Sequence, residues 1–211
     1  MSSAADFIAE LQRERATAIL RTDSQERAAA AMDAAVRAGF RHLEFTLTTP
    51  GALELVTEFS RRPGLVVGTG TVLTPEDARA SVRAGARFLV SPVMDEEVIR
   101  AAALLGVPAI PGCHTPTEML RAHRAGATLQ KLFPAPAGGP DYVRAILAPM
   151  PFLRILPTNG VDATNAAAYL AAGAVAVGFV AALFQAEDLA SGRFDRIEER
   201  AKALLAAVRA P

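Results

Sequence analysis

Apolar and polar positions follow two alternating patterns along the whole chain. Short, nearly continuous apolar runs are typical of buried parallel strands, and the alanine- and arginine-rich stretches between them repeat their apolar positions as amphipathic helices do. The patterns predict strands at residues 16–21, 42–47, 65–72, 88–92, 109–113, 128–134, 154–160 and 174–180. They predict helices at residues 4–15, 24–38, 52–61, 75–84, 96–105, 117–124, 142–147, 163–172 and 194–208.

The residues at the predicted boundaries agree with this division. A glycine commonly follows a helix because it adopts the left-handed conformation that ends it, and small polar residues cap helix beginnings. The glycines that follow a predicted helix are Gly39, Gly85, Gly106, Gly126 and Gly173, and the predicted N-terminal caps are Asp23-Ser24, Thr74 and Asp162. No linker rich in proline or serine divides the chain, so we expect one domain over residues 1–211.

Eight strand–helix units leave two architectures, a closed barrel and an open doubly wound sheet. Gly68-Thr69-Gly70-Thr71 lacks the third glycine of a dinucleotide-binding turn, so we interpret it as a strand edge that passes close to a ligand. Polar residues gather where the predicted strands end, which is the catalytic face of a barrel. They are Arg21, Glu44, Thr46, Thr69, Thr71, Ser91, Thr158 and Asn159. The prediction is therefore an α/β fold, a single (β/α)8 TIM barrel with an extra N-terminal helix.

Composition excludes several classes of function. Apolar residues make up 51% of the chain and charged residues 21%, with a net charge of zero, so no basic surface for nucleic acid is expected. No apolar stretch is long enough for a membrane span, and the first residues lack the profile of a signal peptide. The single cysteine, Cys113, cannot form an internal disulfide, so we expect a cytoplasmic protein.

Lysine is unusually scarce. Of 22 basic residues, only Lys131 and Lys202 are lysines and the other 20 are arginines. Lys202 lies in a charged C-terminal stretch, where a solvated side chain is expected, whereas Lys131 lies in the apolar run Leu129-Gln130-Lys131-Leu132-Phe133. A primary amine kept in an apolar strand indicates a need for amine chemistry that arginine cannot supply.

The second predicted strand places a carboxylate inside the barrel. Alternation puts Leu43, Phe45 and Leu47 on one face and His42, Glu44 and Thr46 on the other. We expect the apolar face to meet the helices and the polar face to point inward. An inward carboxylate is costly unless it is paired, hydrated or functional, so Glu44 is either a catalytic acid/base or half of a structural ion pair with an arginine.

Alternation turns Lys131 to the same side as Leu129 and Phe133, but it leaves open whether that side faces inward. A buried lysine tends toward the neutral amine, which can attack a carbonyl, whereas a lysine at a strand end can also simply reach solvent. A lysine and a glutamate inside one barrel suit class I aldolase chemistry, in which an iminium withdraws electrons from a neighbouring carbon–carbon bond. The chemistry requires the two groups to lie within hydrogen-bonding range, directly or through one water.

Other reactive side chains form weaker patterns. His114 and His123 lack acidic partners at ligand spacing, so we expect no metal site there. Cys113 has no partner that would make it a nucleophile, and a packed side chain is the better interpretation.

Together these segments resemble the 2-keto-3-deoxy-6-phosphogluconate / 2-keto-3-deoxy-6-phosphogalactonate / 4-hydroxy-2-oxoglutarate aldolase family. The resemblance covers residues 16–183, and the phosphogalactonate branch is the most similar. The segments that carry it are Ala18-Ile19-Leu20-Arg21, Leu43-Glu44-Phe45-Thr46-Leu47, Gly68-Thr69-Gly70-Thr71-Val72-Leu73, Val90-Ser91-Pro92, Ile110-Pro111-Gly112, Lys131-Leu132-Phe133-Pro134 and Leu156-Pro157-Thr158-Asn159-Gly160.

The resemblance implies a homotrimeric enzyme that needs no metal or other cofactor and cleaves a 2-keto acid to pyruvate and an aldehyde. It implies Lys131 as the Schiff-base residue and Glu44 as the general acid/base. It further implies Arg21 as the group that holds the substrate carboxylate, in place of an arginine that other members carry where this chain has Thr48. The remaining implied substrate-binding residues are Thr71, Pro92, Gly112, Phe133, Thr158, Asn159 and Gly160.

Two differences from the family pattern fall where a phosphate would bind. Asn159-Gly160 replaces paired glycines, and Phe179-Val180-Ala181 replaces a Gly-Gly-Ser or Gly-Ser turn. Those glycines let backbone N–H groups close around a phosphate. We therefore expect an unphosphorylated, sulfonated or carboxylated tail, or a more apolar aldehyde. The alternatives are a phosphate-sugar isomerase, epimerase or synthase, which would need an intact phosphate site, and a barrel that serves as a non-catalytic scaffold.

Overall fold

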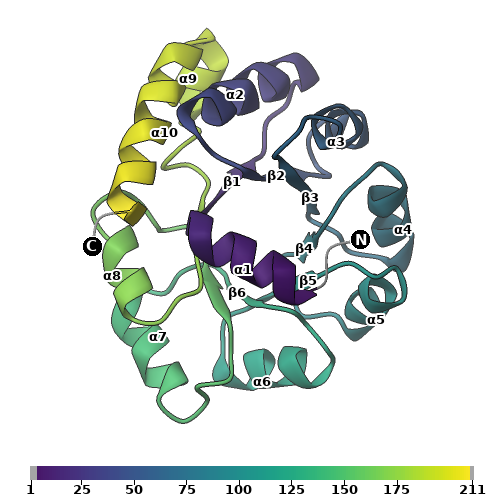
Figure 1. Cartoon of the computed structure of the whole chain (residues 1–211), viewed down its shortest axis with the longest axis vertical. Helices are drawn as coiled ribbons and strands as arrows, with labels where there is room; N and C mark the ends of the chain where they lie inside the picture. The colour runs from purple at the N-terminus through teal and green to yellow at the C-terminus, as the bar shows by residue number, and fades with distance from the viewer. Residues whose placement is uncertain (1–3, 210–211) are drawn as a thin grey trace.

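The computed structural model describes residues 4–209 and shows eight parallel strands arranged around one axis (Figure 1). Each strand pairs with its neighbour in sequence, and β1 also pairs with β8. A parallel bridge between Thr158 and Gly178 brings β7 to β8, so the sheet is a nearly closed barrel and the predicted (β/α)8 architecture is confirmed. The strands are β1 Ala16–Leu20, β2 His42–Thr46, β3 Val66–Gly70, β4 Leu89–Ser91, β5 Ala109–Cys113, β6 Gln130–Leu132, β7 Ile155–Pro157 and β8 Val177–Phe179.

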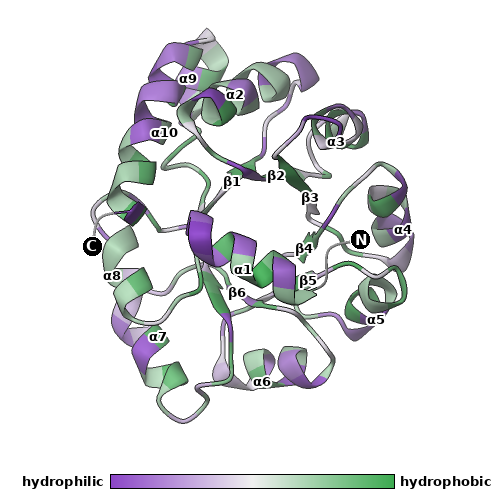
Figure 2. Ribbon diagram, in the orientation of Figure 1, coloured by the Kyte–Doolittle hydropathy of each residue, from purple (hydrophilic) through white to green (hydrophobic). Residues whose placement is uncertain are grey.

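Helices surround the barrel and turn their apolar sides toward it (Figure 2). They are α1 Ala4–Glu14, α2 Gln25–Ala38, α3 Ala52–Ser60, α4 Pro75–Arg83, α5 Glu96–Leu104, α6 Pro116–Arg124, α7 Gly139–Leu147, α8 Ala166–Ala171, α9 Ala186–Ser191 and α10 Phe194–Arg209. Helix α9 was not among the predicted helices. No helix in the described part of the chain is long and apolar enough to cross a membrane.

Most of the predicted helix boundaries are confirmed by their cap geometry. Ser24 and Thr74 accept hydrogen bonds from the backbone of the first helical turn, and Thr74 also forms a reciprocal capping box with Asp77. All five predicted terminal glycines have positive φ angles, from 72° to 118°. The prediction of an N-cap at Asp162 was wrong. The Asp162 carboxylate instead holds a turn that precedes α8, and the N-cap of α8 is Asn165.

The strand alternation predicted for β2 is confirmed. Phe45 packs edge-on against Phe59 of α3, with ring centroids 5.1 Å apart, and Leu43 is buried in the same layer between strands and helices. His42 and Glu44 lie on the other face, inside the barrel, and both are about 1% exposed. The alternation therefore brings a carboxylate into the interior because every outward position of this short strand is taken by an apolar contact with a helix.

Helix α1 crosses the end of the barrel where the strands begin (Figure 1). Phe7 and Leu11 join an interior cluster with Phe88 and with residues from several strands, among them Val90, and this cluster is separate from the larger apolar layer beneath the other helices. These buried side chains fill the interior of the barrel at the end where the strands begin. The opposite end, where the strands finish, stays open to polar side chains.

Candidate active site

A cavity of about 150 Å³ lies at the carboxyl ends of the strands. Seven residues that the sequence predicted for the site line it: Arg21, Glu44, Thr71, Pro92, Lys131, Phe133 and Asn159. Three further residues, Ile19, Thr46 and Val180, complete the wall. Ile19 was not predicted for the site because an apolar side chain at a strand end has the same sequence pattern as a core residue, and Val180 was predicted only as a change in the turn where a phosphate would bind. We refer to this space as the lysine cavity.

The lysine cavity brings Lys131 and Glu44 together from opposite parts of the sheet. Lys131 Nζ lies 3.8 Å from Glu44 Oε1, and the two side chains are only 9% and 2% exposed. This distance is an ion-pair contact rather than a direct hydrogen bond. Lys131 and Phe133 face inward, which answers the question that alternation left open, and Lys131 Nζ lies 5.2 Å from the Phe133 ring centroid.

Burial controls the electrostatics of Glu44. Desolvation raises the pKa of this carboxyl above its usual value of 4.5, and the nearby charges of Lys131 and Arg21 oppose the change without cancelling it. Its Oε2 atom is buried and has no hydrogen-bond partner within the described residues. A carboxyl with a raised pKa beside an amine can donate and accept protons at a higher pH than an exposed glutamate.

The space for Glu44 depends on the glycine-rich end of β3. A Cβ atom on Gly70 would lie 2.0 Å from Glu44 Oε1, and one on Gly68 would lie 2.4 Å from the Phe88 ring. These glycines therefore leave room for the side chains of Glu44 and Phe88, and Thr71 at the end of the same segment lines the cavity. A substitution at Gly70 would displace the carboxylate from its position.

Arg21 and Thr71 form a polar contact at the mouth of the cavity. Arg21 donates a hydrogen bond of 3.1 Å to the Thr71 hydroxyl, and Thr71 has a φ of 61°, in the left-handed region that residues other than glycine rarely adopt. The end of β1 thus places a guanidinium group on the same cavity as the amine and the carboxylate. Such a fork can bind a substrate carboxylate through two parallel hydrogen bonds.

Three predicted site residues lie outside the cavity wall. Gly112 pairs with Lys131 in the sheet, and a Cβ atom there would lie 2.2 Å from the carbonyl oxygen of Pro92, so it allows β4 and β5 to approach. Thr158 is fully buried at the junction of β7 and β8. Gly160 lines a neighbouring, larger cavity that begins beside Asn159.

The remaining reactive side chains have other contacts. The His114 ring lies 3.1 Å from the carbonyl oxygen of Pro134 through Nδ1 and stacks on Tyr142. Cys113 is buried, and desolvation raises its pKa to about 12, which makes it a poor nucleophile. Within residues 4–209, no group of three or more His, Cys, Asp or Glu side chains is arranged to hold a metal ion.

Curated proteins similar to this chain are aldolases. A 2-dehydro-3-deoxy-phosphogluconate aldolase of Pseudomonas aeruginosa is 41% identical over 141 residues, which cover 66% of this chain and 64% of that protein. A probable 2-dehydro-3-deoxy-6-phosphogalactonate aldolase of Rhizobium meliloti is 37% identical over 193 residues, which cover 90% of this chain and 89% of that protein. The matched region therefore spans less than two thirds of the first protein and most of the second.

Solved structures show the same likeness in three dimensions. A native KDPGal structure superposes with a TM-score of 0.84 at 34% identity and covers 92% of this chain and 94% of that one. A KDPG aldolase from Legionella pneumophila, with pyruvate captured as a covalent carbinolamine, superposes with a TM-score of 0.85 at 28% identity and covers 96% and 98%. Residues 7–200 match the family described as KDPG and KHG aldolase, so the chain belongs to this family of lyases.

Proposed function

We propose that the chain is a class I aldolase that cleaves a 4-hydroxy-2-keto acid of the 2-keto-3-deoxy-sugar-acid type to pyruvate and an aldehyde. The observation that carries the proposal is the buried contact of 3.8 Å between Lys131 Nζ and Glu44 Oε1. The captured carbinolamine in the Legionella relative supports the same covalent chemistry, since that structure holds pyruvate on the enzyme.

The reaction begins when the Lys131 amine adds to the C2 ketone of the substrate. Glu44 protonates the departing hydroxyl, water leaves, and an iminium forms. The Glu44 carboxylate then removes the proton of the C4 hydroxyl, the C3–C4 bond breaks, and the electron pair moves into the iminium to give an enamine and a free aldehyde. Protonation of C3 and hydrolysis of the imine release pyruvate and restore the amine.

The other residues of the lysine cavity have positioning roles in this proposal. Arg21, which lies at the cavity mouth, holds the substrate carboxylate and so aligns C2 with the amine. Pro92, Thr71 and Phe133 enclose the three-carbon part that becomes pyruvate. Burial of the amine and the carboxyl excludes bulk water, which would otherwise react with the covalent intermediates.

Two observations favour an aldolase over the two alternatives. A scaffold gains little from this pair, because replacing a buried ion pair by apolar residues is often neutral or stabilising. An isomerase or synthase that acts on sugar phosphates needs an anion site at the ends of β7 and β8. There Val180 and Ala181 replace residues of a glycine-containing turn, and their side chains hinder the approach of an anion to the backbone N–H groups.

Reductive trapping tests the proposed function. Borohydride added with pyruvate should convert the imine to a stable adduct, and peptide mass mapping should place it on Lys131. Because the chain has two lysines, Lys202→Arg is a matched control that should keep the adduct, whereas Lys131→Arg should lose it. A folded wild-type protein that gains no adduct on Lys131 would refute the proposal and favour the scaffold.

We also propose that the enzyme assembles as a homotrimer. A protein cage designed by fusing symmetric oligomeric domains contains a chain that is 33% identical over 92% of this one, with a TM-score of 0.85. Apolar side chains at Leu73 and Val93, which are 51% and 53% exposed, are candidates for burial between subunits. Light scattering on the purified protein should give three times the mass of the chain.

A further inference from the structure

A second, larger cavity adjoins the lysine cavity at the ends of β7 and β8. Its volume is about 570 Å³, and its wall consists of residues 159–164 and 180–182, with Gln185 and the α10 residues Arg200, Ala203 and Leu204. Asn159 and Val180 line both spaces. A substrate cleaved beside Lys131 must place its atoms beyond C4 outside the small first cavity, and this outer cavity is the adjoining space.

The outer cavity has two charged residues in its wall, and their charges have opposite sign. Asp162 is exposed, and its carboxylate accepts hydrogen bonds from the Thr164 backbone and hydroxyl, at 2.8 and 2.6 Å. These bonds hold the pKa of Asp162 below its ordinary value, so the group is an anion at neutral pH. An anionic tail entering here would meet a like charge.

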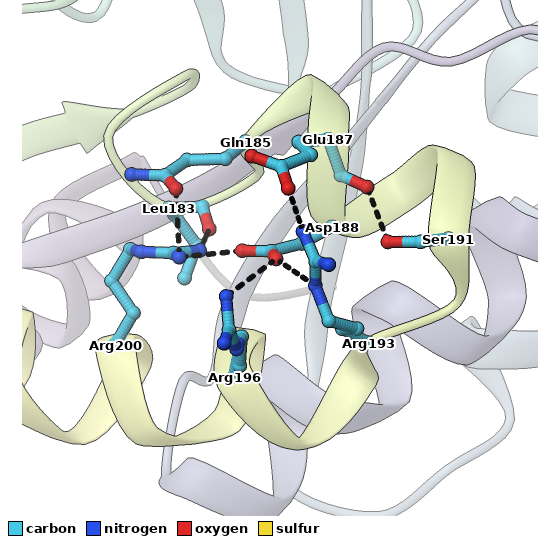
Figure 3. Close-up of polar contacts among 8 residues, drawn as sticks. All are labelled: Leu183, Gln185, Glu187, Asp188, Ser191, Arg193, Arg196 and Arg200. Atoms are coloured by element: carbon cyan, nitrogen blue, oxygen red, sulfur yellow. Dashed lines mark hydrogen bonds and ion pairs between the residues drawn. The ribbon is translucent and has the colours of Figure 1, made fainter.

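The positive charge of Arg200 is already engaged (Figure 3). Its guanidinium donates hydrogen bonds to the Leu183 carbonyl at 2.9 Å, to Gln185 Oε1 at 2.9 Å and to Asp188 Oδ2 at 2.6 Å. Asp188, whose side chain is only 2% exposed, is further paired with Arg193 at 2.8 Å. This network fixes the turn after β8 that forms one wall of the cavity, and it pairs the Arg200 charge with Asp188 and engages three of the five guanidinium N–H donors.

The rest of the wall is largely apolar. Val161 is 2% exposed, and Val180, Ala181, Ala182 and Leu204 present hydrocarbon to the space. Transfer of a charged group from water to such a surface without a free cation is unfavourable, whereas burial of hydrocarbon there is favourable. Asn159 and Gln185 add uncharged polar groups that can contact hydroxyls.

From these contacts we propose that the outer cavity binds the aldehyde part of the substrate and selects an uncharged tail, hydroxylated or aliphatic, over a phosphorylated, sulfonated or carboxylated one. The proposal rests on the proposed aldolase function and specifies its substrate class. It makes Val180, Ala181 and the turn held by Asp188 the structures that determine specificity. The discrimination belongs to the second half of the substrate and leaves the pyruvate half unaffected.

Two pairs of aldehydes test this selection in the synthetic direction with pyruvate. D-Glyceraldehyde and D-glyceraldehyde 3-phosphate differ by the phosphate, and butanal and succinic semialdehyde differ by the carboxylate. In each pair we expect the uncharged aldehyde to have a kcat/KM at least tenfold higher. An anionic member that equals or exceeds its uncharged partner would overturn the proposal.

A charge added to the cavity wall should invert the preference. Ala181→Arg places a cation on the exposed turn after β8, and it should raise the ratio of kcat/KM for the phosphorylated over the unphosphorylated glyceraldehyde at least tenfold, mainly through KM. Ala181→Gln, of similar length without charge, is the matched control and should leave the ratio unchanged. Ala103→Arg, on the exposed side of α5, controls for net charge. An equal change in all three variants would count against the proposal.

Pyruvate trapping separates the two levels of inference. Labelling of Lys131 needs no aldehyde, so an enzyme that is labelled and yet prefers phosphorylated aldehydes refutes only the tail selection. An enzyme that is not labelled refutes the aldolase itself. If Ala181→Arg does not fold, the wild-type comparison of the two pairs still decides the question.

Discussion

Glu44 combines deep burial with a position beside an amine. Desolvation, which is the dominant influence, raises its pKa although Lys131 and Arg21 lie close enough to lower it. In the proposed mechanism, Glu44 takes the proton of the substrate hydroxyl, and for this step its carboxylate form must be present. Activity in the cleavage direction therefore falls as the pH drops through the raised pKa, and this fall occurs at a higher pH than for an exposed glutamate.

A pH profile of kcat/KM for cleavage tests this assignment. The acid limb should lie clearly above pH 4.5, the ordinary value for a glutamate. Glu44→Gln should lower kcat by about 10²- to 10⁴-fold, the usual contribution of a general acid/base. Glu54→Gln, on the exposed face of α3, is the control and should behave as wild type. A limb at or below 4.5, or a nearly active Glu44→Gln enzyme, would contradict the role.

At the scale of elements, α1 and β2 enclose a buried histidine at the closed end of the barrel. His42 is 1% exposed and meets the Phe7 ring edge-on, with centroids 5.7 Å apart. Neither ring nitrogen has a hydrogen-bond partner within the described residues. Burial, with smaller contributions from Arg87 and Arg13, lowers its pKa from 6.5 to about 4. The packing of α1 therefore requires a neutral imidazole.

This arrangement predicts a loss of stability in mild acid. The unfolded chain binds a proton at His42 near pH 6.5 and the folded chain near pH 4, so the free energy of unfolding decreases as the pH falls between those values. Between pH 7 and pH 5 the loss from this residue should be about 2 kcal/mol. In urea titrations at both pH values, His42→Leu should lack this part of the decrease. An identical decrease in both proteins would contradict the prediction.

The elements differ in how far the sequence could predict them. Alternation in β2 and the glycines that follow five of the helices reflect local geometry, so the order of strands and helices could be read from the chain. Helix α9 could not, because Ala186–Ser191 is too short to show a helical period. The strand β6, Gln130–Leu132, is shorter than predicted because pairing with β5 and β7, and not apolar character, determines where a strand ends.

The candidate site shows the same limit. Lys131 and Glu44 could be selected from the sequence because an amine and a carboxylate in apolar strands are unusual there. Their separation depends on closure of the whole barrel, which no local pattern contains. Thr158 has the polar character of a site residue, yet it is buried at the junction that closes the barrel. Val180, by contrast, lines both cavities although its side chain has no chemistry of its own.

At the scale of the whole molecule, one end of the barrel contributes mainly to stability and the other contains the candidate active site. The end where the strands begin is filled by α1 and an interior apolar cluster, in which the Phe7 and Phe88 ring centroids lie 5.3 Å apart. The end where the strands finish contains the buried Lys131–Glu44 ion pair, and in a protein selected for stability alone apolar side chains would replace both members. Substitutions at the two ends should therefore change different properties.

Phe7→Ala should remove a large buried side chain and lower the free energy of unfolding by about 3–5 kcal/mol. Because α1 lies far from the open end, the rate of pyruvate labelling on Lys131 should stay near that of wild type at temperatures where the variant is folded.

The double variant Lys131→Met/Glu44→Gln should show the reverse, no labelling and a melting temperature at least equal to that of wild type, since no buried charge is left without a partner. Calorimetry and trapping on the same samples measure both properties. Coupled losses in either variant would mean that the barrel does not separate stability from chemistry, and that the pair of charges also stabilises the end where the strands finish.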